Sequence, residues 1–332
     1  MTIKNVIDVQ SWETTQKKNV SMTNDKVKLN TRNVDKLIAI HKCSALEANE
    51  IGFIARFLIK ATLPHSKPRL NEWSRKNGNL TMHMMAPSAV GLPYGCYARL
   101  LLVWISTQAI RNKSKLDKGI ITEQEVRKLE LGRSQRRFME ALGLRSSGGK
   151  NGSIVPLREQ MRRLFKTTIS IMLAEINEED GYICEDEMGA RVADISHIWW
   201  SANYPERNLL SQSWVELSPK FFQLIIDKPV PLDMRVLRLI KRSPMALDIY
   251  CWATYRVSYL KRVTIIPWSG LMEQMGSNYA DVKDFKRRFN DGLEKVQLAW
   301  PGLDATPTEK GLLIKPSAPQ VPRRKKHRTE GY

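Results

Sequence analysis

The sequence predicts an α+β fold that contains one structural unit twice, and three observations lead to it. First, Ser153–Thr168 and Asn278–Trp300 each combine an apolar stripe at helical spacing with a basic opposite side. The first stripe is Leu157, Met161, Leu164 and Phe165, and the second is Val282, Phe285, Phe289, Leu293 and Val296. Second, a long apolar helix is expected upstream of each, at Tyr97–Arg111 and at Met245–Lys261. Third, the shorter segments around them follow in the same order in both halves of the chain. A repeated unit is a stronger signal than one basic helix alone.

The predicted order of elements in each copy is helix, strand, helix, helix, strand, strand. The first copy has its strand at Val126–Leu131 and its short helix at Ser134–Leu142, and the second has them at Val263–Trp268 and Ser269–Met275. This is the order of the winged helix, a helix-turn-helix variant whose last helix lies in the DNA major groove. We therefore predict an α+β protein with two tandem winged-helix modules and a helical N-terminal extension.

The last two strands of each copy predict a hairpin, the wing. In the first copy Thr167–Ile176 alternates as a strand, and a return strand begins at Tyr182. In the second copy the hairpin is expected within Thr306–Leu313. Acidic residues surround the first wing, and these are Glu178, Glu179, Asp180, Glu185, Asp186 and Glu187. Because like charges repel phosphate, we expect this wing to point away from DNA or toward a basic protein partner.

Composition divides the chain into four parts. Residues 1–33 are polar and predict a flexible arm, and residues 318–332 form a basic tail. Residues 34–231 hold the N-terminal extension and the first module, and residues 232–317 hold the second module. In the extension, a helical pattern of apolar residues runs through Val34–Ala61, and Leu80–Met85 predicts a strand.

The net charge of +19 over 332 residues indicates a polyanionic or membrane partner. Since no run of about 18 apolar residues is present, we expect no membrane partner. Nucleic acid is the favoured polyanion because the basic residues gather on the predicted helices. The four cysteines lack paired spacing, which is typical of reduced core residues and favours a cytoplasmic protein.

We predict the DNA contacts on the basic sides of the two helices. In the first module these residues are Arg158, Arg162 and Lys166, and in the second they are Lys283, Lys286 and Arg287. Arg and Lys reach either guanine edges or phosphates, and spacing does not separate the two. The wider set of candidate DNA-binding residues adds Arg133, Arg136, Lys150, Arg163 and Lys295.

Catalytic chemistry finds little support in the sequence. Ser146–Ser153 is rich in glycine but lacks the spacing of a phosphate-binding loop, so we interpret it as the turn between two helices. Neighbouring acidic residues on one turn, such as Glu178 and Glu179, do not converge on a metal ion. The histidines are scattered, without zinc spacing. We therefore predict no catalytic residue, no metal and no cofactor.

Several long segments resemble the plasmid-encoded RepA replication initiator family. They are collinear and include ATLPHSKP at Ala61–Pro68, LELGRSQRRFMEALGL at Leu129–Leu144 and SPMALDIYCWATYR at Ser243–Arg256. The resemblance covers about residues 50 to 317. It implies an initiator that binds repeated double-stranded origin DNA and recruits the host initiator and replicative helicase. It names no cofactor or catalytic residue, and a homodimer stays open.

Two other functions stay open at this point. One is a winged-helix transcriptional repressor, which could also repress its own gene. The other, less favoured, is a DNA nickase. A nickase of the rolling-circle type needs a His-rich metal motif and a catalytic Tyr, and the sequence has no pair of His flanking one apolar residue.

Overall fold

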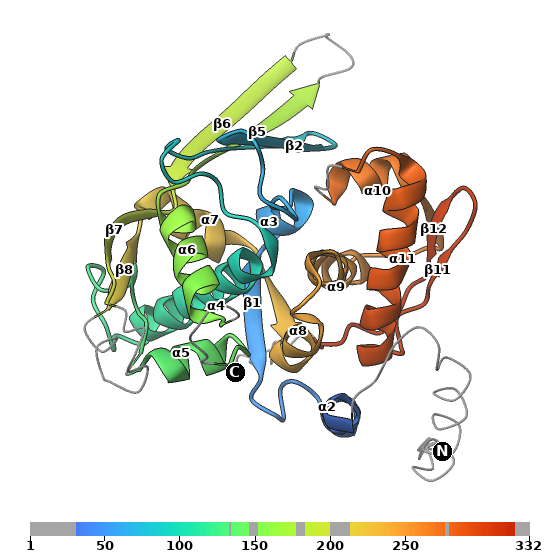
Figure 1. Cartoon of the computed structure of the whole chain (residues 1–332), viewed down its shortest axis with the longest axis horizontal. Coiled ribbons are helices and arrows are strands. Elements are labelled where there is room, and N and C mark those ends of the chain that lie inside the picture. The colour runs from blue at the N-terminus through green and yellow to red at the C-terminus, as the bar shows by residue number, and fades with distance from the viewer. Residues whose placement is uncertain are drawn as a thin grey trace, which may run out of the picture.

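The computed structural model describes residues 31–132, 134–145, 152–176, 183–199, 213–275 and 279–322. It is an α+β protein with two winged-helix modules and an N-terminal extension, as predicted. Figure 1 shows the first module on the left and the second on the right, with the central helices α4 and α9 between them. Among the described residues, no helix is both long and apolar enough to cross a bilayer.

The first module follows the predicted order of elements. The elements are α4 (Gly95–Asp117), β4 (Lys128–Glu130), α5 (Gln135–Ala141), α6 (Ile154–Phe165), β5 (Thr168–Ile176) and β6 (Ile183–Arg191). Buried residues cover every side of α4 between Ala98 and Thr107, so this helix is the centre of the module's core. Ser134 caps α5 by accepting a hydrogen bond from the backbone N–H of Arg137.

The second module repeats this order with shorter wing strands. The elements are α9 (Pro244–Val257), β10 (Thr264–Pro267), α10 (Trp268–Gln274), α11 (Val282–Ala299), β11 (Ala305–Pro307) and β12 (Gly311–Ile314). The three strands form one antiparallel sheet in the order β10-β12-β11. Ser243 caps α9, and Pro244 occupies the first turn, where its missing N–H costs nothing.

The first module departs from this simple sheet. Its wing strands β5 and β6 join a hairpin from the N-terminal extension, β2 (Glu72–Asn77) and β3 (Leu80–Met85), in the order β2-β3-β5-β6. The strand β8 (Trp214–Leu217) lies between β4 and β7 (Ala193–His197) in a separate sheet. Insertions therefore extend the first wing and separate it from β4.

The N-terminal extension is only partly helical, so the prediction of a helical pattern through Val34–Ala61 was wrong in its second half. The helix α2 (Thr31–Lys42) ends before a turn, after which come β1 (Ile51–Ala55) and the short α3 (Arg56–Lys60). The strand β1 pairs with β9 (Pro229–Asp233), about 180 residues away. Such long-range pairing leaves no local pattern, and β9 contains two prolines that predict a break instead.

Two further helices connect the modules. The helix α7 (Pro219–Asp227) packs on α4 and β1, and α8 (Met234–Ile240) follows β9 directly. The backbone N–H of Asp233 donates to the buried hydroxyl of Tyr250, which fixes the start of α8 against α9. The second module therefore begins on a strand that belongs to the sheet of the N-terminal extension.

A buried ion pair joins the two central helices. Arg99 of α4 donates from Nε and Nη2 to the two carboxylate oxygens of Asp248 of α9, each at 2.7 Å. His65 Nε2 lies 2.8 Å from Asp248 Oδ2, and since a carboxylate only accepts, Nε2 carries the hydrogen. Burial alone would raise the pKa of Asp248, but the Arg99 charge and these hydrogen bonds lower it. The pair therefore stays charged at the interface between the modules.

Candidate nucleic-acid interface

The helix α6 presents one basic stripe to solvent. Leu157, Met161, Leu164 and Phe165 are buried, as the spacing predicted. The opposite side exposes residues three or four positions apart, and these are Val155, Arg158, Arg162 and Lys166. The exposed stripe therefore combines three cations with one apolar residue, which could contact a thymine methyl group.

Arg163 does not belong to this stripe, so its prediction as a DNA contact is corrected. Its side chain is buried; Nε donates to Glu159 Oε1 at 2.9 Å and Nη1 donates to the Leu92 carbonyl at 3.2 Å. The guanidinium also lies over the ring of Tyr94. Arg163 follows Arg162 in sequence, and the helical step of 100° turns it toward the module. It holds α6 against the segment before α4.

Arg162 and Arg136 are exposed and each has a carboxylate beside it. Arg162 Nε lies 3.3 Å from Glu159 Oε2, and Arg136 Nε lies 2.9 Å from Glu140 Oε1. Exposed pairs of this kind contribute little free energy, so either guanidinium can exchange its carboxylate for a phosphate. Arg133 and Lys150, two other predicted contacts, lie outside the described residues.

The helix α11 has the predicted stripe with one correction. Phe285, Phe289, Leu293 and Val296 are buried, and Trp268 lies edge-on to both phenylalanine rings. Val282, which the spacing placed on the same stripe, is 40% exposed. It is the first residue of the helix, where the chain has not yet packed onto the core.

The N-terminal half of α11 carries its basic surface. Lys283, Arg287 and Arg288 are exposed, and Arg287 Nη2 lies 2.6 Å from Asp284 Oδ1. Sequence reasoning missed Arg288, although it adjoins Arg287 and lies off the apolar stripe. Asp281 caps the helix by accepting from the backbone N–H of Asp284. The C-terminal half is mixed in charge, because Asp291 and Glu294 are exposed beside Lys295.

Lys286 has a packing role in addition to its charge. Its Nζ donates to the Glu309 carbonyl at 3.2 Å and lies over the Trp268 ring. Glu309 lies between β11 and β12, at the tip of the second wing. Lys286 therefore ties the helix to its wing and is half-buried, whereas Lys283 and Arg287 are exposed.

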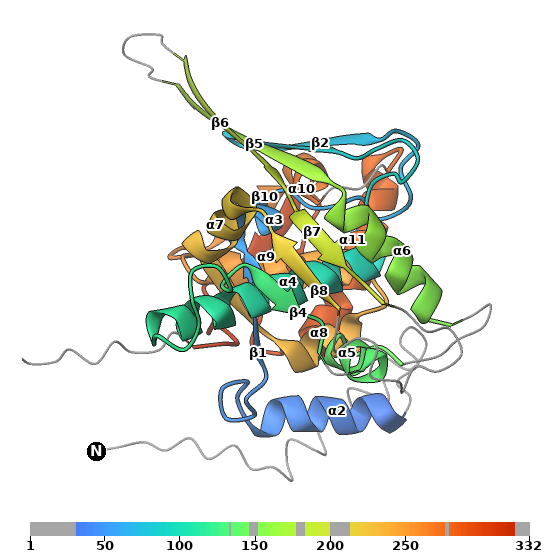
Figure 2. The ribbon, with the colours of Figure 1, turned by 90° about the vertical axis from the view of Figure 1, so that its left-hand side faces the viewer.

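The two basic helices lie toward one side of the molecule. In Figure 1, α6 and α11 flank α4 and α9, and both run roughly from top to bottom of the view. After the 90° turn in Figure 2, both lie right of the centre. Neither helix is enclosed, since each keeps an exposed basic face.

The first wing is acidic where the structure describes it. Glu185, Asp186 and Glu187 of β6 are exposed, while the predicted acidic tip at Glu178, Glu179 and Asp180 lies outside the described residues. Figure 2 shows β5 and β6 extending beyond the body of the molecule at the top left, on the other side from α6. Among the described residues, no group of three or more metal-ligating side chains gathers that could hold a metal ion.

A family comparison matches more than half of the chain. The family model described as plasmid encoded RepA protein covers residues 92–269. The matched segment begins just before α4 and ends at the start of α10, so it includes the whole first module and the beginning of the second. No curated protein sequence matches the chain.

Solved structures with a similar arrangement include two crystal structures of domains 2 and 3 of RctB. The selenomethionine derivative has a TM-score of 0.48 and 9% identity, and covers 80% of this chain and 97% of that one. The other has a TM-score of 0.45 and 10% identity, and covers 78% of this chain and 96% of that one.

Proposed function

Because the chain belongs to the plasmid-encoded RepA family of replication initiators, we propose that it binds repeated double-stranded DNA at a plasmid origin through α6 and α11. From the bound origin it would recruit the host initiator and replicative helicase. This proposal places the protein in the bacterial cytoplasm, where the plasmid is copied. It assigns the chain no strand cleavage and no nucleotide hydrolysis.

The observation that carries the proposal is the pair of exposed basic helices on one side of a duplicated fold. In a helix-turn-helix protein, the second helix of the motif lies in the major groove and its N-terminal residues contact base edges. The cations Lys283, Arg287 and Arg288 occupy that half of α11. On α6, the outward cations are Arg158 in the N-terminal half and Arg162 in the C-terminal half.

Two modules in one chain suit two successive major grooves on the same face of the duplex, about 10 base pairs apart. Each Arg–guanine pair contributes about 1–3 kcal/mol of discrimination against a wrong base. Asp284 would orient Arg287 for such a contact, since the ion pair between them holds the guanidinium along the exposed face. Lys166 at the end of α6 suits a phosphate contact.

A binding assay with one variant for each helix tests the proposal. We expect the purified protein to bind origin repeats more tightly than scrambled DNA in fluorescence anisotropy. Lys283→Glu with Arg287→Glu should weaken specific binding at least about 30-fold, and Arg158→Glu with Arg162→Glu should do the same. Plasmid replication should fail with either variant.

The matched control reverses two cations elsewhere. Lys115 and Lys118 are exposed at the C-terminal end of α4, which lies on the left of Figure 2, away from α6 and α11. Changing both to Glu alters the net charge equally and should leave sequence preference intact. Full specific binding by either helix variant would contradict the assignment of that helix. Protection of one operator without repeats would instead favour a repressor.

A further inference from the structure

A second group of cations gathers where the two modules meet, and neither recognition helix accounts for most of it. Lys36 comes from α2, Arg145 follows α5, and Lys241 and Arg242 form the turn between α8 and α9. Lys295 of α11 lines the same shallow groove as Arg242. Five cations from four separate segments of the chain therefore converge on one surface.

Lys241 lies at the centre of this group. Its ammonium donates to the carbonyl of Gly143 at the end of α5, which fixes it between the modules. Burial lowers the pKa of Lys241, and the positive charges of Lys36, Arg242, Arg145 and Arg238 lower it further. The four named cations are thus close enough to repel it.

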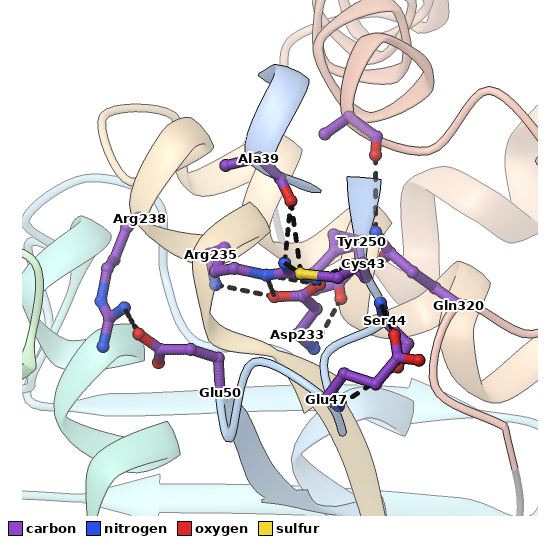
Figure 3. A network of polar contacts seen from close by, with 11 residues as sticks. Ala39, Cys43, Ser44, Glu47, Glu50, Asp233, Arg235, Arg238, Tyr250 and Gln320 are labelled. Carbon is purple, nitrogen blue, oxygen red and sulfur yellow. Dashed lines mark hydrogen bonds and ion pairs between the residues drawn. The ribbon is translucent and has the colours of Figure 1, made fainter. Parts of the chain in front are cut away.

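Little negative charge offsets this group. Arg238 points away from Arg235 toward Glu50 and pairs with it at 2.7 Å, as Figure 3 shows. In the part of the chain that the structure describes, Arg238 is the one of these cations that forms an ion pair. Clustered like charges raise the free energy of the folded state, so their gathering points to an anionic partner rather than to stability.

The group adjoins both recognition helices. Arg145 lies in the helix-turn-helix of the first module, between α5 and α6, and Lys295 lies on α11 of the second. The turn at Lys241 contacts both: Lys241 donates to Gly143, two residues before Arg145, and Arg242 lines the same groove as Lys295. In Figure 1, α5, α8 and the lower end of α11 form the lower part of the molecule, below and between α6 and α11. Figure 2 shows α5 and α8 right of the centre with α6 and α11.

We propose that Lys36, Arg145, Lys241, Arg242 and Lys295 form a phosphate-binding surface that holds the DNA backbone between the two major grooves. The inference rests on the proposed function and adds to it a contact that fixes both modules on one duplex. The occupant is the sugar–phosphate backbone, because the gathered cations have little acidic offset. Arg242 and Lys295 also line a groove beside Leu37, Leu239 and Leu298. Contacts of this kind position the protein and carry no sequence information.

Salt dependence of binding tests this surface. The variant Lys36→Gln, Arg145→Gln, Arg242→Gln leaves Lys241 and Arg238 in place, because these two also pack at the interface between modules. Each phosphate contact contributes about −0.9 to the slope of log K against log salt concentration. We expect the variant to reduce the slope by about 2 to 3 on repeat DNA and on random DNA alike. The ratio of the two affinities should stay unchanged.

The control variant Arg111→Gln, Lys115→Gln, Lys118→Gln removes the same charge from the far end of α4. A slope unchanged in the first variant would overturn the inference, and so would an equal decrease in both variants, which would reflect net charge alone. If this surface bound an acidic protein instead of DNA, the salt slope of DNA binding would stay unchanged in the first variant. If the unmodified protein itself fails to prefer repeat DNA, the proposed function fails instead.

The melting temperature of the Lys36→Gln, Arg145→Gln, Arg242→Gln variant should be equal to or higher than that of the unmodified protein, because the repulsion among the cations is relieved.

Discussion

The ion pair between Arg99 and Asp248 is the residue-level contact that joins the modules. Arg99 also donates to the carbonyls of Leu63, Pro64 and Gly95, so its guanidinium is fully satisfied without water. Buried pairs of this kind contribute little net stability over apolar residues, but removing one partner leaves a buried charge. The contact therefore specifies how α4 meets α9 more than it stabilises the fold.

Asp248→Asn should destabilise the protein by about 3–5 kcal/mol, because the Arg99 charge would lose its buried partner. Urea unfolding followed by circular dichroism measures this difference. Asp117→Asn is the matched control, since the ion pair between Lys113 and Asp117 is exposed and its loss should change little. Equal effects of the two substitutions would show that the pair between the modules is solvated.

The stability of the protein should fall as pH decreases below about 6.5. Burial lowers the pKa of His65 below its usual 6.5, although the hydrogen bond to Asp248 opposes the shift. Between the two pKa values the unfolded chain binds a proton that the folded chain does not, so stability rises with pH there. His65→Gln should make the melting temperature less dependent on pH between about 7 and 5.

His41 provides the comparison for this pH experiment. Burial also lowers the pKa of His41, so His41→Gln should flatten part of the same dependence. The double variant should be flatter than either single variant. If neither substitution alters the dependence of the melting temperature on pH, the proton uptake on unfolding belongs to other groups.

The apolar stripe of α11 can be tested at single residues. Phe289→Ala should destabilise by about 3–5 kcal/mol, because its buried ring packs on Trp268 and Phe285. Val282→Ala, on the same predicted stripe but partly exposed, should change the free energy of unfolding far less. Thermal unfolding of both variants distinguishes the residues that the helical period alone grouped together.

At the scale of elements, α2 depends on one arginine. As Figure 3 shows, Arg235 reaches from α8 to the carbonyls of Ala39 and Cys43 at the end of α2, and it also pairs with Asp233. A cation at the last carbonyls of a helix satisfies acceptors that have no partner within the helix. The docking of α2 onto α8 therefore rests on this side chain together with the apolar contacts of Leu37.

Arg235→Met should release α2 without unfolding the second module. Hydrogen–deuterium exchange in peptides from residues 33–42 should accelerate about tenfold or more, the equivalent of roughly 1.4 kcal/mol. Peptides from α11 should keep their protection. Arg238→Met on the same helix is the control, because its partner is Glu50 rather than α2. Unchanged exchange in α2 would show that apolar contacts alone hold it.

Periodicity and repetition predicted the elements whose causes are local. The helices α4 and α9 are apolar nearly all round, and α6 and α11 carry apolar stripes, so their positions follow from short stretches of sequence. Ser243 and Asp281 also cap α9 and α11. The pairing of β1 with β9 and the joining of β2 and β3 to the first wing depend on residues far apart, which no local pattern records. The burial of Arg163 likewise depends on Glu159 together with the distant Leu92 carbonyl.

Across the molecule, the duplicated unit explains why two basic helices, each a weak indication of DNA binding by itself, together favour a DNA-binding surface. One basic helix is most often a solvated surface, but two on the same side of one rigid body can bind one duplex together. The N-terminal extension supports this arrangement, since β1 holds β9 and α2 holds α8 at the point where the second module starts. The basic group around Lys241 lies at the same place.

Hydroxyl-radical footprinting on origin repeats tests this arrangement most directly. We expect two protected segments on one face of each repeat, about one helical turn apart. The variant with Arg158 and Arg162 reversed should lose one segment, and the variant with Lys283 and Arg287 reversed should lose the other. A single protected segment with the unmodified protein, or two segments that both persist when either helix is altered, would contradict this arrangement.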